Sequence, residues 1–465
     1  MIVLLCAALS SAMFYLSQGW NDVWALAWIA PAPLLWLAYG ALPRWQLFVA
    51  SLAAFAAGQV YMVFSYGPAL IVTELAMTLG LGSLFAGAIL FARLVWRRLS
   101  AWASLLAFPA LWTAIEYGVS LVSPHGSWGA LGYSQMSFPV AIQIAALFGL
   151  YAVTFVLCLF ANALALLARG AKTAGVAGFA VCTASIIFGV TQLIAPQAPV
   201  VRVAALGDEG QAYMKAFHTG DMAAALSVTR NYSDAIRAEA AKGTRFFVTP
   251  EGGVQGSRNA RSDVLAPLMA AARDTHSVIV VGALSRDPAR NMALAFYPSG
   301  RVNEYDKRHL LSPFEDRFTP GQAPGLLGNG LAVAICKDLD FPRTLRADVR
   351  AARYQNGIRI MAVPASDFMK DDWIHARMAI MRGVENGFAM VRSAFNGLET
   401  VSDAQGRLIA SARIDRPGMI VISAAVSPGN GPTLYTRIGD AFSWLCVALS
   451  LGLGVGATRR NQGVS

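Results

Sequence analysis

The stretch LAVAICKDLDFP at residues 331–342 changes character at Cys336. The apolar run before the cysteine predicts a buried β-strand, and the charged residues Lys337 and Asp338 after it predict a turn. Chemistry in α/β sheets collects at the carboxyl ends of strands, so this thiol lies where a nucleophile is expected. The simpler interpretation is a core position, which is the usual role of a lone Cys on an apolar strand.

Short apolar runs and amphipathic stretches alternate throughout residues 198–437. Alternating strands and helices predict a layered α/β domain. The predicted strands are 200–206, 245–249, 278–284, 292–297, 331–336, 358–364, 388–394 and 418–424. The predicted helices are 222–241, 262–275, 343–356 and 372–386.

The rest of the chain has a different composition. The whole sequence of 465 residues is 56% hydrophobic and 14% charged, well below the roughly one quarter of charged residues usual in soluble domains. Most of the apolar excess lies in residues 1–197. We therefore expect a transmembrane helical domain at 1–197, a globular domain at 198–437, a last transmembrane helix at 438–457 and a cytoplasmic tail at 458–465.

Apolar segments long enough to cross a bilayer predict about eight spans. The first segment has no basic region before it and other spans follow at once, so it is interpreted as a retained helix and not as a signal peptide. The predicted spans are 2–18, 23–41, 46–66, 69–92, 102–122, 138–167, 174–195 and 438–457.

The loops between these spans predict the orientation. With the N-terminus in the cytoplasm, every second loop lies inside, and the three outer loops at 19–22, 67–68 and 123–137 contain no Lys or Arg. The positive-inside rule then places residues 198–437 outside the cytoplasm. We expect a multi-pass protein of the bacterial inner membrane with a periplasmic domain. The basic residues at the inner ends of spans are Arg44, Arg93, Arg97, Arg98, Arg169, Lys172, Arg459 and Arg460.

This charge distribution also bears on partners and metals. The net charge of +10 comes largely from span ends, and no basic run is interleaved with aromatic residues, so nucleic acid is not expected as a partner. No pair among the five His residues and no Cys/His spacing is typical of a metal site. No cofactor is expected.

Two further residues follow predicted strands as Cys336 does. Glu251 ends the string TPE after one strand, and Lys307 follows the strand pair around 292–305. A carboxylate can take the thiol proton if burial raises the carboxyl pKa, and an ammonium stabilises both the thiolate and an oxyanion. Each residue alone has an ordinary interpretation, since Glu after Pro commonly caps a helix and Lys in a charged run is usually solvated.

The ordered motifs add a resemblance. TPE at 249–251, YDKRHLLSPFE at 305–315 and ICKDLDFP at 335–342 resemble the nitrilase, or carbon–nitrogen hydrolase, superfamily. PASDF at 364–368 and RGVENGFAMVRSAFNG at 382–397 are similar to it too. The resemblance implies an αββα sandwich, with Glu251 as general base, Lys307 as oxyanion stabiliser and Cys336 as the acylated nucleophile.

The membrane half narrows the resemblance to one branch, the apolipoprotein N-acyltransferases. WTAIEYGVS at 112–120, HGSWGALGYSQ at 125–135 and NGPTLYTRIGD at 430–440 are similar to that branch. The resemblance implies transfer of an acyl chain from a membrane phospholipid to Cys336 and then to the N-terminal amine of a diacylated lipoprotein. Both substrates are lipids, so the thiol must work at a bilayer surface. Glu315 would be an accessory carboxylate.

The sequence departs from this branch around the thiol. The branch usually has an aromatic residue and then Glu after the cysteine, whereas Lys337 and Asp338 follow here. Asp338 keeps a supporting carboxylate that is one methylene shorter. The Gly of the usual Pro-Phe-Gly-Glu is missing before Glu315, and EDRFTPG at 315–321 looks more like soluble amidases.

Three alternatives remain beside the acyltransferase. A membrane-anchored nitrilase-type amidase or hydrolase would use the same three residues with water as acceptor. A non-catalytic partner protein would keep the fold, although it would be expected to lose a member of the triad. A transporter would need paired charges within the membrane, and none are expected beyond Glu74 and Glu116.

Overall fold

The computed structural model describes residues 1–459 other than 66, 196–198, 256–262, 353–356, 369 and 415. Several predicted features lie partly outside the described residues: the end of span 46–66, the boundary at 197, the start of helix 262–275, the end of helix 343–356 and the tail 458–465. Internal contacts divide the chain into two units. One is Met1–Ala195 with Ile438–Ser465, and the other is Pro196–Arg437.

The first unit is helical, and within the described residues five of its helices are long and apolar enough to cross a membrane. They are α5 (Ile71–Arg98), α6 (Ala101–Val122), α9 (Leu150–Ala168), α10 (Lys172–Ile194) and α17 (Ala441–Arg459). Helices that are apolar on all sides can be stable only where no side faces water, which a bilayer provides. The chain is therefore a membrane protein.

The three other predicted spans, at 2–18, 23–41 and 46–66, contain shorter helices, and the first of them is the single helix α1. The span expected at 23–41 divides near Pro31, which is the N-cap of α2 and cannot donate a backbone hydrogen bond within a continuing helix. The described residues therefore contain five candidate membrane spans, against the eight that were predicted. The shorter helices of this unit are α1 (Ile2–Ser17), η1 (Trp24–Trp28), α2 (Ala32–Ala38), α3 (Arg44–Gly58), α4 (Val60–Phe64), η2 (Pro68–Leu70), η3 (Leu131–Gln135), α7 (Pro139–Ile142) and α8 (Ala145–Phe148).

The second unit contains two β-sheets. One has the strand order β13-β1-β2-β4-β5-β6, with β3 paired to β4, and the other has the order β12-β11-β10-β9-β8-β7. The strands of the first sheet are β1 (Val201–Asp208), β2 (Phe246–Val248), β3 (Val254–Gln255), β4 (Val278–Arg286), β5 (Ala289–Phe296), β6 (Val302–Asp306) and β13 (Met419–Val426). Those of the second are β7 (Leu326–Gly328), β8 (Leu331–Val333), β9 (Ile360–Ser366), β10 (Ala389–Phe395), β11 (Leu398–Ser402) and β12 (Leu408–Arg413).

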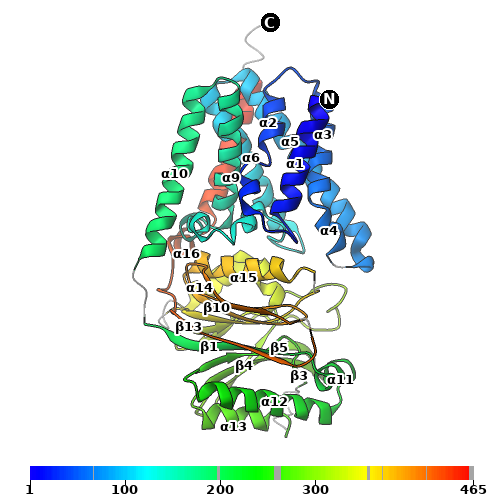
Figure 1. Cartoon of the computed structure of the whole chain (residues 1–465), viewed down its shortest axis with the longest axis vertical. Coiled ribbons are helices and arrows are strands. Elements are labelled where there is room, and N and C mark those ends of the chain that lie inside the picture. Colours follow the sequence, from blue (N-terminus) through cyan, green and yellow to red (C-terminus); the bar gives the residue numbers. More distant parts are fainter. Residues whose placement is uncertain are drawn as a thin grey trace. The chain divides into compact units, whose positions relative to one another are not determined.

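Helices cover the outer face of each sheet (Figure 1). In β1, Val203 and Ala205 lie in the core between the sheets, whereas Ala204 and Leu206 lie in the core under the helices of the first sheet. Both faces of each sheet are thus buried, and the predicted αββα sandwich is confirmed. The helices are α11 (Gln211–Thr219), α12 (Met222–Ala240) and α13 (Ala266–Asp274) on one side, η4 (Cys336–Asp340), α14 (Pro342–Ala351) and α15 (Asp372–Asn386) on the other, and α16 (Leu434–Ile438) near the end.

Candidate functional site

Cys336 lies three residues beyond the end of β8, where the chain leaves the sheet. Its backbone has φ +42°, which a strand cannot accommodate, so it opens the short helix η4 and does not end the strand as predicted. A non-glycine residue in this left-handed region is strained, and such strain is common at functional sites. The thiol donates toward the carbonyl oxygen of Ser366 across 3.5 Å.

The end of β9 brings Glu251 beside this thiol. The backbone N–H of Glu251 donates to the carbonyl of Ala365 at 3.1 Å, one residue before the partner of Cys336. Gly282 on β4 makes this approach possible, because a Cβ there would lie 2.1 Å from the carbonyl oxygen of Pro250. The sequence predicted these two residues at separate strand ends, and the structure brings both to the carboxyl end of β9.

Lys307 is a buried cation between two carboxylates. Its Nζ donates to Glu251 Oε1 at 2.7 Å and to the two carboxylate oxygens of Glu315 at 2.9 and 2.8 Å. Its side chain is 2% exposed, so water does not replace these contacts. The predicted accessory residue Glu315 is thus in direct contact with the predicted triad.

Asn291 completes the cluster, and the sequence analysis missed it. Its Nδ2 donates to Glu251 Oε1 and to Glu315 Oε1, both at 2.6 Å. Its carbonyl accepts the backbone N–H of Lys307 at 2.8 Å. A polar side chain directly before the apolar run 292–296 of β5 was the available signal, since buried polar groups need partners.

The buried charges shift one another's pKa values. Burial raises the pKa of Glu251, although the neighbouring Lys307 opposes the rise. Burial alone would lower the pKa of Lys307, but the charges of Glu251, Cys336 and Glu315 outweigh it and raise that pKa. Burial and then the Glu251 charge raise the pKa of the Cys336 thiol. The thiol is therefore neutral at rest, and a neighbouring carboxylate with a raised pKa can take its proton during attack.

Asp338 connects the loop that contains Lys307 to the turn that contains Cys336. Its Oδ1 accepts the backbone N–H groups of Arg308 and His309 at 3.1 and 2.9 Å, and its Oδ2 accepts the Tyr305 hydroxyl at 2.7 Å and the Ile335 N–H at 3.0 Å. Burial disfavours its charge, but hydrogen bonds from His309 and Tyr305 prevail and lower its pKa. The carboxylate thus fixes the Lys307 loop against the Cys336 turn.

Lys337 does not stand alone beside the thiol. It is 5% exposed, and its Nζ lies 3.6 Å from Asp340 Oδ2. Burial raises the pKa of Asp340, and the Lys337 charge opposes that rise. The unusual lysine therefore interacts with a carboxylate of its own short helix.

A second buried ion pair lies near Cys336. Arg392 on β10 bonds Asp367, which directly follows the Ser366 carbonyl that the thiol contacts. Burial raises the pKa of Asp367 and the Arg392 charge opposes it. Within the part of the chain that the structure describes, Asp367 Oδ2 is buried and has no hydrogen-bond partner. Neither residue was predicted as part of the site. Asp367 does lie in PASDF at 364–368, one of the motifs that resemble the superfamily.

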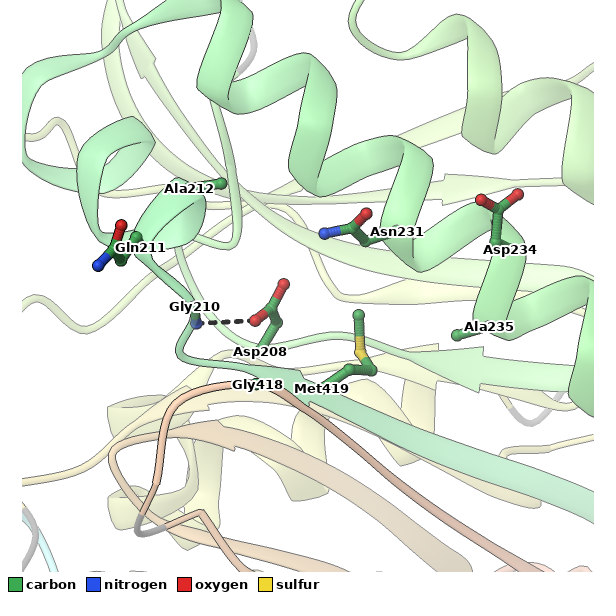
Figure 2. Close-up of a pocket in the computed structure, with 9 residues that line it drawn as sticks. All are labelled: Asp208, Gly210, Gln211, Ala212, Asn231, Asp234, Ala235, Gly418 and Met419. Atoms are coloured by element: carbon green, nitrogen blue, oxygen red, sulfur yellow. Dashed lines mark hydrogen bonds between the residues drawn. The ribbon is translucent and has the colours of Figure 1, made fainter.

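The α/β unit also has a hollow of about 460 Å³ that contains no member of the triad. Figure 2 shows it between the end of β1 and helix α12, with Asp208 held by the N–H of Gly210 at 2.8 Å. Its lining residues are Asp208, Gly210, Gln211, Ala212, Asn231, Asp234, Ala235, Gly418 and Met419. The triad therefore lies outside this hollow.

Family models match both units of the chain. The carbon–nitrogen hydrolase model matches residues 203–437, which contain the whole cluster around Cys336. The chain belongs to the carbon–nitrogen hydrolase family. The model of the apolipoprotein N-acyltransferase N-terminal domain matches residues 10–164.

Relatives of full length share both parts. An apolipoprotein N-acyltransferase of Geobacter metallireducens is 28% identical over 98% of this chain and 96% of its own length. One of Vibrio parahaemolyticus is 26% identical over 97% of this chain and 96% of its own. With the N-terminal match, these relatives place the chain in the apolipoprotein N-acyltransferase branch, an enzyme family, as predicted.

Solved structures of the nitrilase superfamily show a weak likeness to about half of the chain. A nitrilase-superfamily amidase of Nesterenkonia has a TM-score of 0.41 and 21% identity over 54% of this chain and 97% of its own. The Nit3 protein of Saccharomyces cerevisiae has a TM-score of 0.40 and 19% identity over 50% of this chain and 92% of its own.

Proposed function

We propose that the chain moves a fatty acyl chain from a membrane phospholipid, through a thioester on Cys336, to the N-terminal amine of an S-diacylglyceryl-cysteine lipoprotein. The observation that supports this most is the meeting of Glu251, Lys307 and Cys336 beside β9, in a chain whose full-length relatives carry that name. The membrane unit fits the chemistry, because both substrates are anchored in a bilayer.

The first half-reaction forms the thioester. Glu251 takes the thiol proton, and the thiolate of Cys336 attacks the ester carbonyl of the phospholipid. The Lys307 ammonium stabilises the oxyanion of the tetrahedral intermediate. When the C–O bond breaks, the proton on Glu251 passes to the leaving oxygen, which gives a lysophospholipid and an acylated cysteine.

The second half-reaction consumes the thioester. The free amine of the lipoprotein attacks the thioester carbonyl, and Glu251 takes a proton from the nitrogen. The C–S bond breaks, an amide remains on the lipoprotein, and the proton returns to the sulfur of Cys336. Asn291 holds the Glu251 carboxylate in place and also binds Glu315, and Asp338 holds the two loops.

We further propose the arrangement in the membrane. A domain 1–197 and a last helix at 438–457 form about eight spans in the bacterial inner membrane, with residues 198–437 in the periplasm. The concentration of basic residues in every second loop supports this orientation. Periplasmic reporter fusions within 198–437 and cytoplasmic labelling of a cysteine placed at Lys172 test it; the reverse labelling pattern contradicts it.

One experiment tests the reaction. The purified full chain receives a phospholipid with a labelled acyl chain and a diacylglyceryl peptide, and mass spectrometry follows both. We expect acyl-Cys336 before the peptide is added and a triacylated peptide afterwards. A Cys336→Ser variant that still transfers the label refutes the nucleophile. An acyl-enzyme that loses its label to water and never to the amine makes the chain a membrane-anchored hydrolase.

A further inference from the structure

Arg93 is a buried cation in the helical unit. It lies in the second-last turn of α5 and is 4% exposed. Its Nε and Nη1 are buried and have no hydrogen-bond partner among the described residues. A basic residue that only sets membrane topology needs no burial, so the position of Arg93 requires another explanation.

The N-terminus of α3 lies at the level of Arg93. The two helices pack antiparallel, with Phe55 stacked on Phe85 at 4.8 Å and a Cβ on Gly82 lying 3.7 Å from Ala56. Arg44 begins α3 about three turns before Ala56, and Arg93 follows Gly82 on α5 by about three turns, so both reach the same height.

Other arginines surround this point. Arg97, one turn after Arg93, donates through Nη2 to the carbonyl of Gly40 at 3.2 Å, four residues before α3 begins. The charges that act on Arg93 come from Arg97 and Arg44, and both repel it. The side chains of Arg44 and Arg97 are exposed. The described residues thus hold three cations together without a carboxylate that neutralises Arg93.

The α3 N-terminus adds donors of its own. Pro43 is the N-cap and provides no side-chain cap, and the first helical hydrogen bond runs from the Leu47 N–H to the Pro43 carbonyl. The N–H groups of Arg44, Trp45 and Gln46 precede that bond. Uncapped amides at the positive end of a helix are a favourable site for an anion.

We propose that the α3 N-terminus, Arg93, Arg44 and Arg97 bind the phosphate group of an anionic phospholipid. Arg93 would supply the buried contact, and the two exposed arginines would flank the phosphate. The site lies at the end of α5, a helix apolar and long enough to cross a bilayer, which is the depth of lipid headgroups. The site would thus take a structural lipid, distinct from the acyl donor and independent of the proposed reaction.

Native mass spectrometry of the full chain tests the site. The protein is released from nanodiscs of phosphatidylcholine that contain a minor fraction of phosphatidylglycerol, and the lipid retained per chain is measured. We expect one retained phosphatidylglycerol in the wild type. Arg93→Gln should weaken retention at least tenfold, and Arg44→Gln about fivefold, since each arginine near the headgroups contributes attraction.

Lys172→Gln is the matched control, because it removes the same charge from the exposed first turn of α10. It should retain lipid as the wild type does. If Arg93→Gln fails to fold, the exposed Arg44→Gln decides. Wild-type retention in both arginine variants overturns the proposal. Displacement of the lipid by inorganic phosphate at equal occupancy assigns the site to a free anion, which also overturns it.

Discussion

Lys307 and Arg93 are both buried cations, with exposed fractions of 2% and 4%, yet they differ in their hydrogen-bond partners. In the α/β unit, Lys307 donates to Glu251 and to Glu315. In the helical unit, two nitrogens of Arg93 have no partner among the described residues. Lys307 must act at a fixed distance, and carboxylates of its own chain neutralise it. Arg93 has no such carboxylate among the described residues, so its charge is suited to an anion that is not part of the chain. The predictions below test this contrast.

Lys307→Met should have the largest effect. It leaves Glu251 and Glu315 buried side by side without the cation, so we expect acyl transfer to fall about 10²–10³-fold and stability to fall by about 3 kcal/mol. Without Lys307, burial raises the folded pKa of Glu251 further, because the charge that opposed the rise is gone. Raised pKa values give stability at low pH that is lost as the pH rises, so the variant should be least stable above neutrality. Thermal unfolding at several pH values and the transfer assay check this.

Lys242→Met is the control for this prediction. Lys242 also pairs with a carboxylate, Glu239, but its side chain is 62% exposed. Exposed pairs contribute about 0–1 kcal/mol, so neither activity nor the unfolding midpoint should change noticeably. Equal destabilisation by the two substitutions would show that the buried cluster is not special.

Asp338→Asn should have the next largest effect. The backbone N–H groups around this position donate hydrogen bonds, and the nitrogen of the Asn amide cannot accept them. The Lys307 loop and the Cys336 turn therefore lose part of their connection. We expect a 10–100-fold loss of kcat, because a misplacement of about 1 Å can reduce catalysis that much. The alkylation rate of Cys336 gives a second readout.

The control is Asp403→Asn, which changes another buried carboxylate that accepts backbone N–H groups, from Gln405 and Arg407. It should lower stability without lowering kcat at matched temperature. If Asp403→Asn reduces kcat as much as Asp338→Asn does, then Asp338 has no special role in placing the two loops.

Some features of the molecule could be predicted from the sequence, and others could not. Eight strands and four helices of the α/β unit follow from alternating apolar runs and amphipathic stretches, whereas β7, β11 and β12 were not predicted. The carboxyl ends of the predicted strands place Glu251 and Cys336 near each other. The strand β3 consists of two residues, Val254 and Gln255, which no periodicity can reveal. The positive φ of Cys336 depends on the turn into η4, which the run of apolar residues before it does not encode.

The burial of single polar residues could not be predicted either. Asn291 looks like one polar residue at the start of a strand, and Arg93 looks like one of several basic residues at a span end. Their roles depend on which distant segments pack against them: the 307–315 loop on Asn291, and α3 beside Arg93. The local sequence pattern indicates the periodicity of strands and helices, whereas these contacts depend on tertiary packing.

His375 provides a prediction about pH within the α/β unit. Burial alone would lower its pKa, but Asp371, bonded at 2.9 Å, and the charges of Asp367 and Asp340 raise it to about 9. Its ordinary pKa is about 6.5, so the stabilisation is complete below that pH and is lost as the pH rises through 9. We expect a decrease on the order of 1–3 kcal/mol across this window.

The unfolding midpoint measured between pH 6 and 10 checks this decrease. His375→Gln should be less stable than the wild type at pH 6 and should show a flatter profile, and Asp371→Asn should flatten it as well. An unchanged slope in both variants would place the titration on another group.

Arg93→Met should have the smallest effect, and its sign should be opposite to that of Lys307→Met. In a neutral detergent without anionic lipid, Arg93 has two buried nitrogens without a partner among the described residues and is repelled by Arg44 and Arg97. An apolar side chain of similar length removes both penalties, so we expect the variant to be more stable by about 1 kcal/mol. Adding phosphatidylglycerol should stabilise the wild type and not the variant, because a ligand stabilises only the protein that binds it. A variant that is less stable than the wild type without lipid would mean that Arg93 is already satisfied within its own chain, and the difference between the two buried cations would disappear.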